Sequence, residues 1–184
     1  MIARRGLMAL GAVGILGMAG TACTTDVKTV SNVDAAYGRK LDRLLVSVDL
    51  GYRHSSGLVV TDEATYLKMD EVIDSLRAAF ASTGVTTEFV TQESALPAAT
   101  ASFRPTQILN IGVSAYTKDM GNPNAFTLKC EIRDAATQKR IWLSTITFEA
   151  SQTAGTRLLR AASKKAADNF ASNLVGRLRQ DRLI

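Results

Sequence analysis

Apolar and polar residues alternate along several stretches of the chain, and such alternation predicts β-strands. The clearest stretch covers residues 44–50, whose apolar face consists of Leu44, Val46, Val48 and Leu50. The other predicted strands are the β-prone run 85–92, the strongly apolar run 107–116, and the stretches 125–133 and 140–149. We expect the last two strands to form a hairpin around residues 134–139.

Two other stretches repeat apolar residues at steps of three and four, which is the period of an amphipathic helix. The first helix is expected over residues 61–80, with Thr61 or Asp62 as its N-cap and Gly84 just beyond its end. The second is expected over about residues 156–181, and its many alanines indicate that it lies closely on a sheet.

In chain order these elements read β-α-β-β-β-β-α. Because a helix separates only the first two strands and turns join the later ones, we predict an α+β fold, with a mixed sheet and the two helices packed on one face. Nothing in the sequence indicates an internal repeat or a second domain. The segments expected to lack regular structure are residues 24–40, 52–57, 93–105 and 121–124.

The chain begins with the pattern of an export signal. Arg4 and Arg5 precede an uncharged, mainly apolar run over residues 7–19, and small residues lead up to Cys23. The apolar run is too short to span a bilayer as a helix. The whole pattern resembles a bacterial lipoprotein signal, in which residues 1–22 are removed and Cys23 is lipidated. A plain secretory signal cleaved at the same bond and a twin-arginine signal are the alternatives.

The lipoprotein interpretation sets the expected location and the division into domains. Residue 24 is a threonine and not the aspartate that resembles an inner-membrane retention signal. We therefore favour the periplasmic face of the outer membrane over the inner membrane. Residues 23–40 would form a lipidated tether, and residues 41–184 a single periplasmic domain.

The net charge argues against nucleic acid as a partner. The whole chain carries a formal charge of +5, and removal of the two leader arginines leaves +3. A mildly basic protein of this kind suits anionic lipid or glycan, but it lacks the concentrated positive charge of nucleic-acid-binding proteins.

Cys130 is expected to be a free, buried thiol. If Cys23 carries lipid, Cys130 has no partner for an intrachain disulfide. It shares the alternation of Phe126, Leu128 and Ile132 and so points to the same side of its strand. We therefore interpret Cys130 as a small core residue.

The sequence offers little material for catalysis. Its single histidine, His54, lies beside Ser55 and Ser56, but no Gly-x-Ser-x-Gly elbow surrounds these serines. We find neither a cluster with the spacing of metal ligands nor a glycine-rich phosphate loop. We therefore expect no enzyme activity, no cofactor and no metal site. A hydrolase that uses His54 with Ser55 or Ser56 is the less favoured alternative.

Trp142 alternates with the apolar residues Ile141 and Leu143, which leaves two interpretations. Either a helix covers Trp142, or its side chain is exposed at a partner surface. We favour the core because large exposed aromatic side chains are rare. The residues retained as candidates for a partner surface are Trp142, Tyr52, Arg53 and His54, together with the basic face of the last helix.

The carboxy-terminal third resembles a group of envelope accessory lipoproteins. Their shared pattern is an aspartate, a turn with threonine and lysine, and a hydrophobic-tryptophan pair that opens the next strand; here these are Asp134, Thr137, Lys139, Ile141 and Trp142. The group includes the curli-secretion lipoprotein, Lpo-type activators of penicillin-binding proteins, the Pel-type exopolysaccharide lipoprotein, auxiliary lipoproteins of lipid-transport ABC systems and the lipopolysaccharide-assembly lipoprotein. Glycine often occupies the position of Gln138 in this group. The resemblance implies a non-catalytic, lipid-anchored protein that faces the periplasm and serves a larger machine.

We therefore expect an accessory or assembly subunit of an envelope machine for secretion, polysaccharide export, lipid transport or cell-wall synthesis, acting through protein–protein interaction. The expected partners are the membrane, through lipid on Cys23, and an envelope protein complex, while self-association into a homo-oligomer stays open. The main alternative is a periplasmic carrier that holds a lipid or another small molecule between its helices and its sheet.

Overall fold

The computed structural model describes residues 26–53, 59–60, 67–119, 122–149 and 159–184. The export signal, Cys23, His54, Ser55 and Ser56 lie outside these residues. What the sequence predicts about lipidation and about a hydrolase centred on His54 therefore stays a prediction.

A mixed sheet of six strands forms the centre of the described chain, in the order β1-β8-β7-β6-β2-β5. The strands are β1 (Asp26–Val33), β2 (Arg43–Asp49), β5 (Thr86–Val90), β6 (Gln107–Asp119), β7 (Asn122–Asp134) and β8 (Arg140–Glu149). β2 pairs in parallel with both β5 and β6, whereas β6, β7, β8 and β1 pair antiparallel. A separate pair of short strands, β3 (Tyr52–Arg53) and β4 (Val59–Val60), follows β2.

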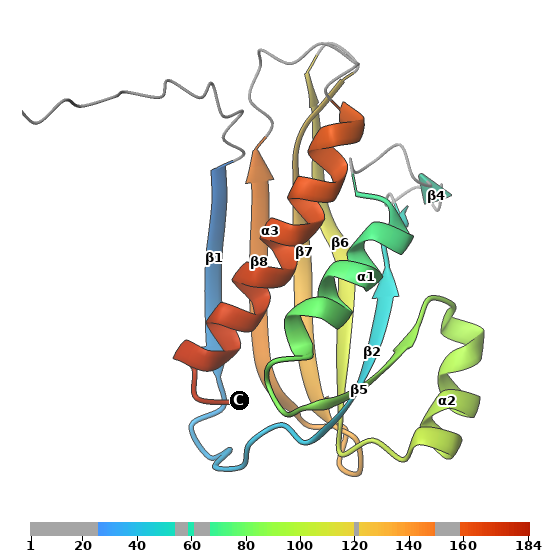
Figure 1. Ribbon diagram of the computed structural model, residues 1–184, viewed down its shortest axis with the longest axis vertical. Coiled ribbons are helices and arrows are strands. Elements are labelled where there is room, and N and C mark those ends of the chain that lie inside the picture. The colour runs from blue at the N-terminus through green and yellow to red at the C-terminus, as the bar shows by residue number, and fades with distance from the viewer. Residues whose placement is uncertain (1–25, 54–58, 61–66, 120–121, 150–158) are drawn as a thin grey trace, which may run out of the picture.

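Two helices, α1 (Met69–Phe80) and α3 (Leu159–Gln180), lie side by side on one face of the sheet (Figure 1). The predicted α+β class, with a mixed sheet and two helices on one face, is thus confirmed. α1 begins at Met69, and not at residue 61 or 62, because the backbone of Lys68 is still extended. Residues 61–66 lie outside the described chain.

A third helix, α2 (Leu96–Phe103), follows the short 3-10 turn η1 (Glu93–Ala95). The sequence predicted a loop here, and that prediction is wrong. Pro97 lies in the first turn of α2, where its missing N–H costs no helical hydrogen bond. Arg104, in the left-handed conformation with φ of 51°, ends the helix just before Pro105.

β1 is the second element that the sequence missed, because Asp26–Val33 lie in the expected tether. Its residues pair with β8 along the whole strand. Val30 is 69% exposed, and the side chains of Thr29 and Ser31 are polar, so β1 lacks the apolar face by which the other strands were recognised. The folded sheet therefore begins only three residues after Cys23.

The main core fills the space between the sheet and the helices α1 and α3. Fully buried residues of the strands, such as Val46 and Leu128, meet Leu76 of α1 and Leu174 of α3. A ligand held between helices and sheet, as the carrier hypothesis requires, would have to displace these side chains. Within the residues described, no helix is long and apolar enough to cross a bilayer.

Cys130 and Trp142 both belong to this core. Cys130 is a free cysteine with no exposed surface, as predicted, and its burial raises the pKa of its thiol far above the ordinary value. Trp142 is 1% exposed, so it is a core residue and cannot contribute to a partner surface.

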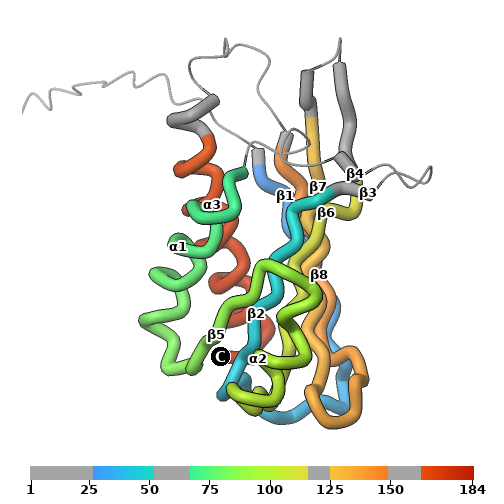
Figure 2. Tube along the Cα trace, turned by 90° about the vertical axis from the view of Figure 1, so that its right-hand side faces the viewer, coloured from blue at the N-terminus to red at the C-terminus, as the bar shows by residue number. Residues whose placement is uncertain are grey.

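α2 lies on the opposite side of the sheet from α1 (Figure 2) and covers only part of that face. Leu96, Ala99 and Phe103 pack there against a small cluster of Leu45, Val90 and Ile108. Beyond this cluster the face carries mainly polar side chains, such as Ser47, Asn110 and Lys129. We call this uncovered part the open face.

Candidate binding groove

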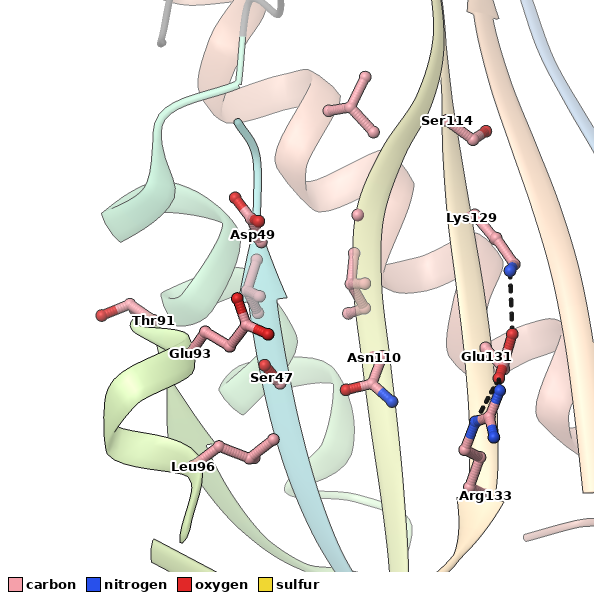
Figure 3. A pocket seen from close by; sticks show the side chains of 14 residues that line it. Ser47, Asp49, Thr91, Glu93, Leu96, Asn110, Ser114, Lys129, Glu131 and Arg133 are labelled. Atoms are coloured by element: carbon pink, nitrogen blue, oxygen red, sulfur yellow. Dashed lines mark hydrogen bonds and ion pairs between the residues drawn. The ribbon is translucent and has the colours of Figure 1, made fainter. Parts of the chain in front are cut away.

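The topology of the sheet creates a crevice between β2 and β6. From its carboxyl end, β2 continues through α1 to β5, whereas β6 continues through a hairpin to β7 on the other side. The two connections thus leave the sheet in opposite directions. In sheets with parallel strands, ligands commonly bind where such connections diverge, at the carboxyl ends of the two strands. A groove with a volume of about 470 Å³ lies at this place on the open face (Figure 3).

The floor of the groove consists of residues that stand in register on three neighbouring strands. Asp49 of β2, Gly112 of β6 and Lys129 of β7 form one row. Ser47, Asn110 and Glu131 form the next row. Because adjacent strands are about 4.8 Å apart, the backbones that carry Asp49 and Lys129 are separated by roughly 10 Å.

Gly112 leaves the middle of the first row without a side chain. A Cβ atom added at Gly112 would meet the backbone oxygen of Asp49 at 3.6 Å, an ordinary contact distance. The position would therefore accept a side chain, and the glycine keeps a gap open between the carboxylate of Asp49 and the ammonium group of Lys129.

A buried carboxylate holds the basic side of the groove in place. The side chain of Glu131 is 8% exposed. It forms an ion pair with Lys129, with 3.0 Å between Nζ and Oε2, and a second ion pair with Arg133. Burial by itself would raise the pKa of Glu131, but the hydrogen bonds from the two cations outweigh burial and lower that pKa below its usual value. Two positive charges against one negative charge leave this side of the groove cationic.

The opposite side of the groove is acidic. Asp49 is exposed, and one of its carboxylate oxygens accepts a 2.9 Å hydrogen bond from the backbone N–H of Gly51, which fixes its orientation. Glu93 and Leu96, at the start of η1 and α2, complete this wall. The groove therefore has an acidic wall and a basic wall that face each other across a glycine.

Two polar groups on the floor are available to a ligand. The carboxamide of Asn110 and the hydroxyl of Ser47 are half-buried, and neither forms a side-chain hydrogen bond within the described chain. An amide offers both a donor and an acceptor, which matches the peptide group of a polypeptide. The arrangement suits binding of a polar, dipolar chain.

The described residues that were predicted for a partner surface belong to other parts of the fold. Tyr52 and Arg53 form β3, which is a neighbour of β6, and His54 lies outside the described residues. The basic side chains of α3 are partly engaged, since Lys164 pairs with Asp168 and Arg177 pairs with Asp181. Of the residues named from the sequence that the structure describes, none lines the groove.

A sequence signal for the groove does exist. β7 carries Lys129, Glu131 and Arg133 at alternate positions. Their side chains lie on the face of the strand opposite to its apolar side chains. Three charged residues on one face of a strand predict a solvated face. Their position opposite Asp49 depends on the strand order, which the sequence pattern alone does not give.

The motif shared with the accessory lipoproteins builds the hairpin between β7 and β8. One carboxylate oxygen of Asp134 accepts hydrogen bonds from the backbone N–H groups of Ala136 and Thr137 and from the Thr137 hydroxyl, at 2.9–3.1 Å. These bonds lower the pKa of Asp134. Gln138 has a φ of 58°, the left-handed conformation that favours glycine. The motif residues therefore fix a turn.

Among the residues described, no group of three or more histidine, cysteine, aspartate or glutamate side chains could hold a metal ion.

No protein-family model matches the sequence, and no curated protein matches it. Among solved structures, the fold is similar to that of a PelC dodecamer from Paraburkholderia phytofirmans, with 17% identity, a TM-score of 0.48, and coverage of 80% of this chain and 96% of that chain. It is also similar to protein XCC0632 from Xanthomonas campestris, with 16% identity, a TM-score of 0.45, and coverage of 83% of this chain and 94% of that chain.

Proposed function

We propose that this protein is a non-catalytic accessory subunit of the bacterial envelope, which binds a segment of a partner protein in the groove on the open face of its sheet. The observation that carries the proposal is the row of Asp49, Gly112 and Lys129, which places opposite charges on the two sides of a gap. Glu131 supports this row by holding Lys129 in position.

The chemistry of the groove favours a polypeptide segment of mixed charge. A basic side chain of the partner would meet Asp49, and an acidic one would meet Lys129 or Arg133, which remain 48% and 43% exposed. Asn110 would bond the intervening peptide group. Opposite charges in register mainly give specificity and orientation, because each charge rejects the wrong register of the segment.

Lipid anchoring through Cys23, at the periplasmic face of the outer membrane, is part of this proposal. β1 begins at Asp26, and three extended residues span at most about 11 Å. A lipid on Cys23 would hold the folded domain at the membrane surface, without the long tether that the sequence suggested. The subunit would then meet partners that are themselves in or near that membrane.

The test is crosslinking in cells, followed by affinity purification of the full-length protein carrying Gly112→Leu. Leucine fills the gap in the first row, and its Cβ fits the available space. The matched control is Gly38→Leu, because Gly38 lies outside the groove with no atom within 4 Å of an added Cβ.

We expect the wild type and the Gly38→Leu variant to recover one stoichiometric set of envelope proteins, and the Gly112→Leu variant to lose at least one of them. Recovery of that same set by all three proteins would overturn the role of the groove. Recovery of the protein alone, as a monomer, would overturn the accessory role. A defined multimer of this chain alone would replace it with self-assembly.

A further inference from the structure

β1 is an edge strand, and no other strand of the described residues pairs with its outer side (Figure 1). It pairs with β8 over all eight of its residues, from Asp26 opposite Glu149 to Val33 opposite Trp142, without a shift in register. It contains neither proline nor glycine. Natural sheets usually protect an edge with proline, a bulge or charged side chains, because an unprotected edge pairs with other strands. β1 carries the charged residues Asp26 and Lys28, but it has no proline and no bulge. β1 is regular along its whole length.

The direction of its main-chain groups follows from the pairing. In an antiparallel pair, the N–H and C=O groups of alternate residues point to the partner strand. The N–H of Asp34 donates a 2.9 Å hydrogen bond to the carbonyl of Ile141, in continuation of the β1–β8 register. The even-numbered residues thus face β8. The main-chain groups that face away from it belong to Val27, Thr29, Ser31 and Val33.

A polar groove accompanies this free edge. It has a volume of about 350 Å³ and lies between β1 and α3, where it is lined by Val27, Thr29, Asn173, Gly176 and Gln180 among others. The hydroxyl oxygen of Thr29 is buried and has no hydrogen-bond partner within the described chain. A buried polar atom without a hydrogen-bond partner destabilises the folded protein by about 1–3 kcal/mol. A donor or acceptor from a bound molecule would remove this cost at Thr29.

The floor of this groove has room for a side chain. No atom lies within 4 Å of a Cβ built at Gly176 in α3. A strand placed beside β1 would direct every second side chain toward α3, and the space above Gly176 would receive one of them.

We propose that β1 is a docking strand to which an extended polypeptide segment of another envelope protein adds as a further strand of the sheet. Four residues of β1 present N–H and C=O groups outward, at every second position. An extended polypeptide backbone has hydrogen-bonding groups with the same repeat and therefore matches this edge. A group of that segment supplies the hydrogen bond that Thr29 lacks. This surface is distinct from the groove on the open face.

A second copy of this chain fits the edge less well, by an argument that rests on the proposed lipid anchor. Antiparallel pairing of β1 with β1 of another copy would place the two Asp26 ends at opposite ends of a strand about 25 Å long. Only two residues lie between Cys23 and Asp26 in each copy. If β1 stands upright on the membrane, the two lipids could not then enter the same membrane surface.

The first experiment uses full-length protein with a photo-crosslinking amino acid at Ser172, an exposed residue of α3 that lines the groove, irradiated in cells. Two variants of Thr29 accompany it. Thr29→Pro removes one outward N–H from the middle of the edge without loss of a bond to β8, and its ring obstructs an added strand at this position. Thr29→Val keeps the shape and the N–H, and removes only the hydroxyl.

We expect Ser172 to crosslink to one short segment of one other protein. The yield should fall severalfold in Thr29→Val, which loses one hydrogen bond to the segment, and at least tenfold in Thr29→Pro. A crosslink to another copy of this chain, or a yield that Thr29→Pro does not change, would overturn the proposal. Gly112→Leu should leave this crosslink intact, so that failure of the open-face groove and failure of the edge strand are distinguished.

The second experiment needs no variant and measures amide hydrogen exchange residue by residue. In the isolated protein, the amides of Lys28, Val30 and Asn32 should exchange slowly and those of Thr29, Ser31 and Val33 quickly. In the complex extracted with mild detergent, all six should exchange slowly. Fast exchange of the outward amides in that complex, together with no crosslink from Ser172, would also overturn the proposal.

Discussion

The indole nitrogen of Trp142 donates a 2.8 Å hydrogen bond to the carboxylate of Asp181. Trp142 belongs to β8 and is buried, and Asp181 follows the last residue of α3. The same carboxylate oxygen accepts a hydrogen bond from Ser31 of β1 and pairs with Arg177. One acidic side chain therefore joins the edge strand, the neighbouring strand and the last helix.

Asp181→Ala should destabilise the protein by about 2 kcal/mol, because it leaves the buried N–H of Trp142 without an acceptor. The free energy of unfolding in urea measures this effect. In a Trp142→Phe background, the same substitution should cost at least about 1 kcal/mol less, since the orphaned donor is gone. Equal costs in the two backgrounds would show that the hydrogen bond contributes nothing.

Gln138→Gly should stabilise the protein by about 0.5–1 kcal/mol, because glycine adopts the left-handed conformation of this position without strain. The substitution gives up one exposed hydrogen bond, from the Gln138 side chain to the carbonyl of Ala135. Thermal unfolding measures the change. Lys139→Gly, at a neighbouring position without positive φ, is the control and should destabilise. A lower melting temperature for Gln138→Gly would contradict this account of the hairpin.

Glu131 should contribute stability that depends on pH. Its pKa is lower in the folded protein than the usual value of 4.5, so the folded state favours the ionised form. That contribution is fully present above the unfolded pKa and is lost as the pH falls through the folded pKa. The advantage of the wild type over Glu131→Gln in urea unfolding should therefore be largest at neutral pH and shrink below pH 4.5. A difference that stays constant with pH would contradict the ion pairs with Lys129 and Arg133.

Cys130 should react with thiol reagents only when the protein unfolds, because it is buried and its raised pKa keeps it protonated. In a Cys23→Ser variant, modification should be at least about 1,000-fold slower than that of an exposed thiol, as expected for a group accessible only through opening of the core. Urea below the unfolding transition should increase the rate steeply. Rapid modification in the native state would place Cys130 at the surface.

Several elements were predictable because the signal for them is local. β2 alternates from Leu44 onward, and α1 and α3 repeat apolar residues at helical steps. Such residues are buried whichever neighbour covers them, so their periods follow from the residues themselves. The burial of Cys130 followed from the same alternation.

The missed elements take their structure from distant partners. β1 is a strand because β8 supplies its hydrogen bonds, and Val30 stays exposed on it. α2 buries no residue completely, and Leu45 and Ile108 of the sheet hold it in place. A short, half-solvated segment has no apolar period strong enough to identify its structure, so packing decides.

The sequence by itself determined the strands and helices of the core, the burial of Cys130 and the turn around Asp134, because each depends on residues close together in the chain. Only the tertiary structure decided that Asp49 and Lys129 face each other across Gly112, and that β1 is left open at the edge. Both depend on strand order and register. Those are fixed by contacts between segments far apart in the sequence, where no local pattern specifies the partner.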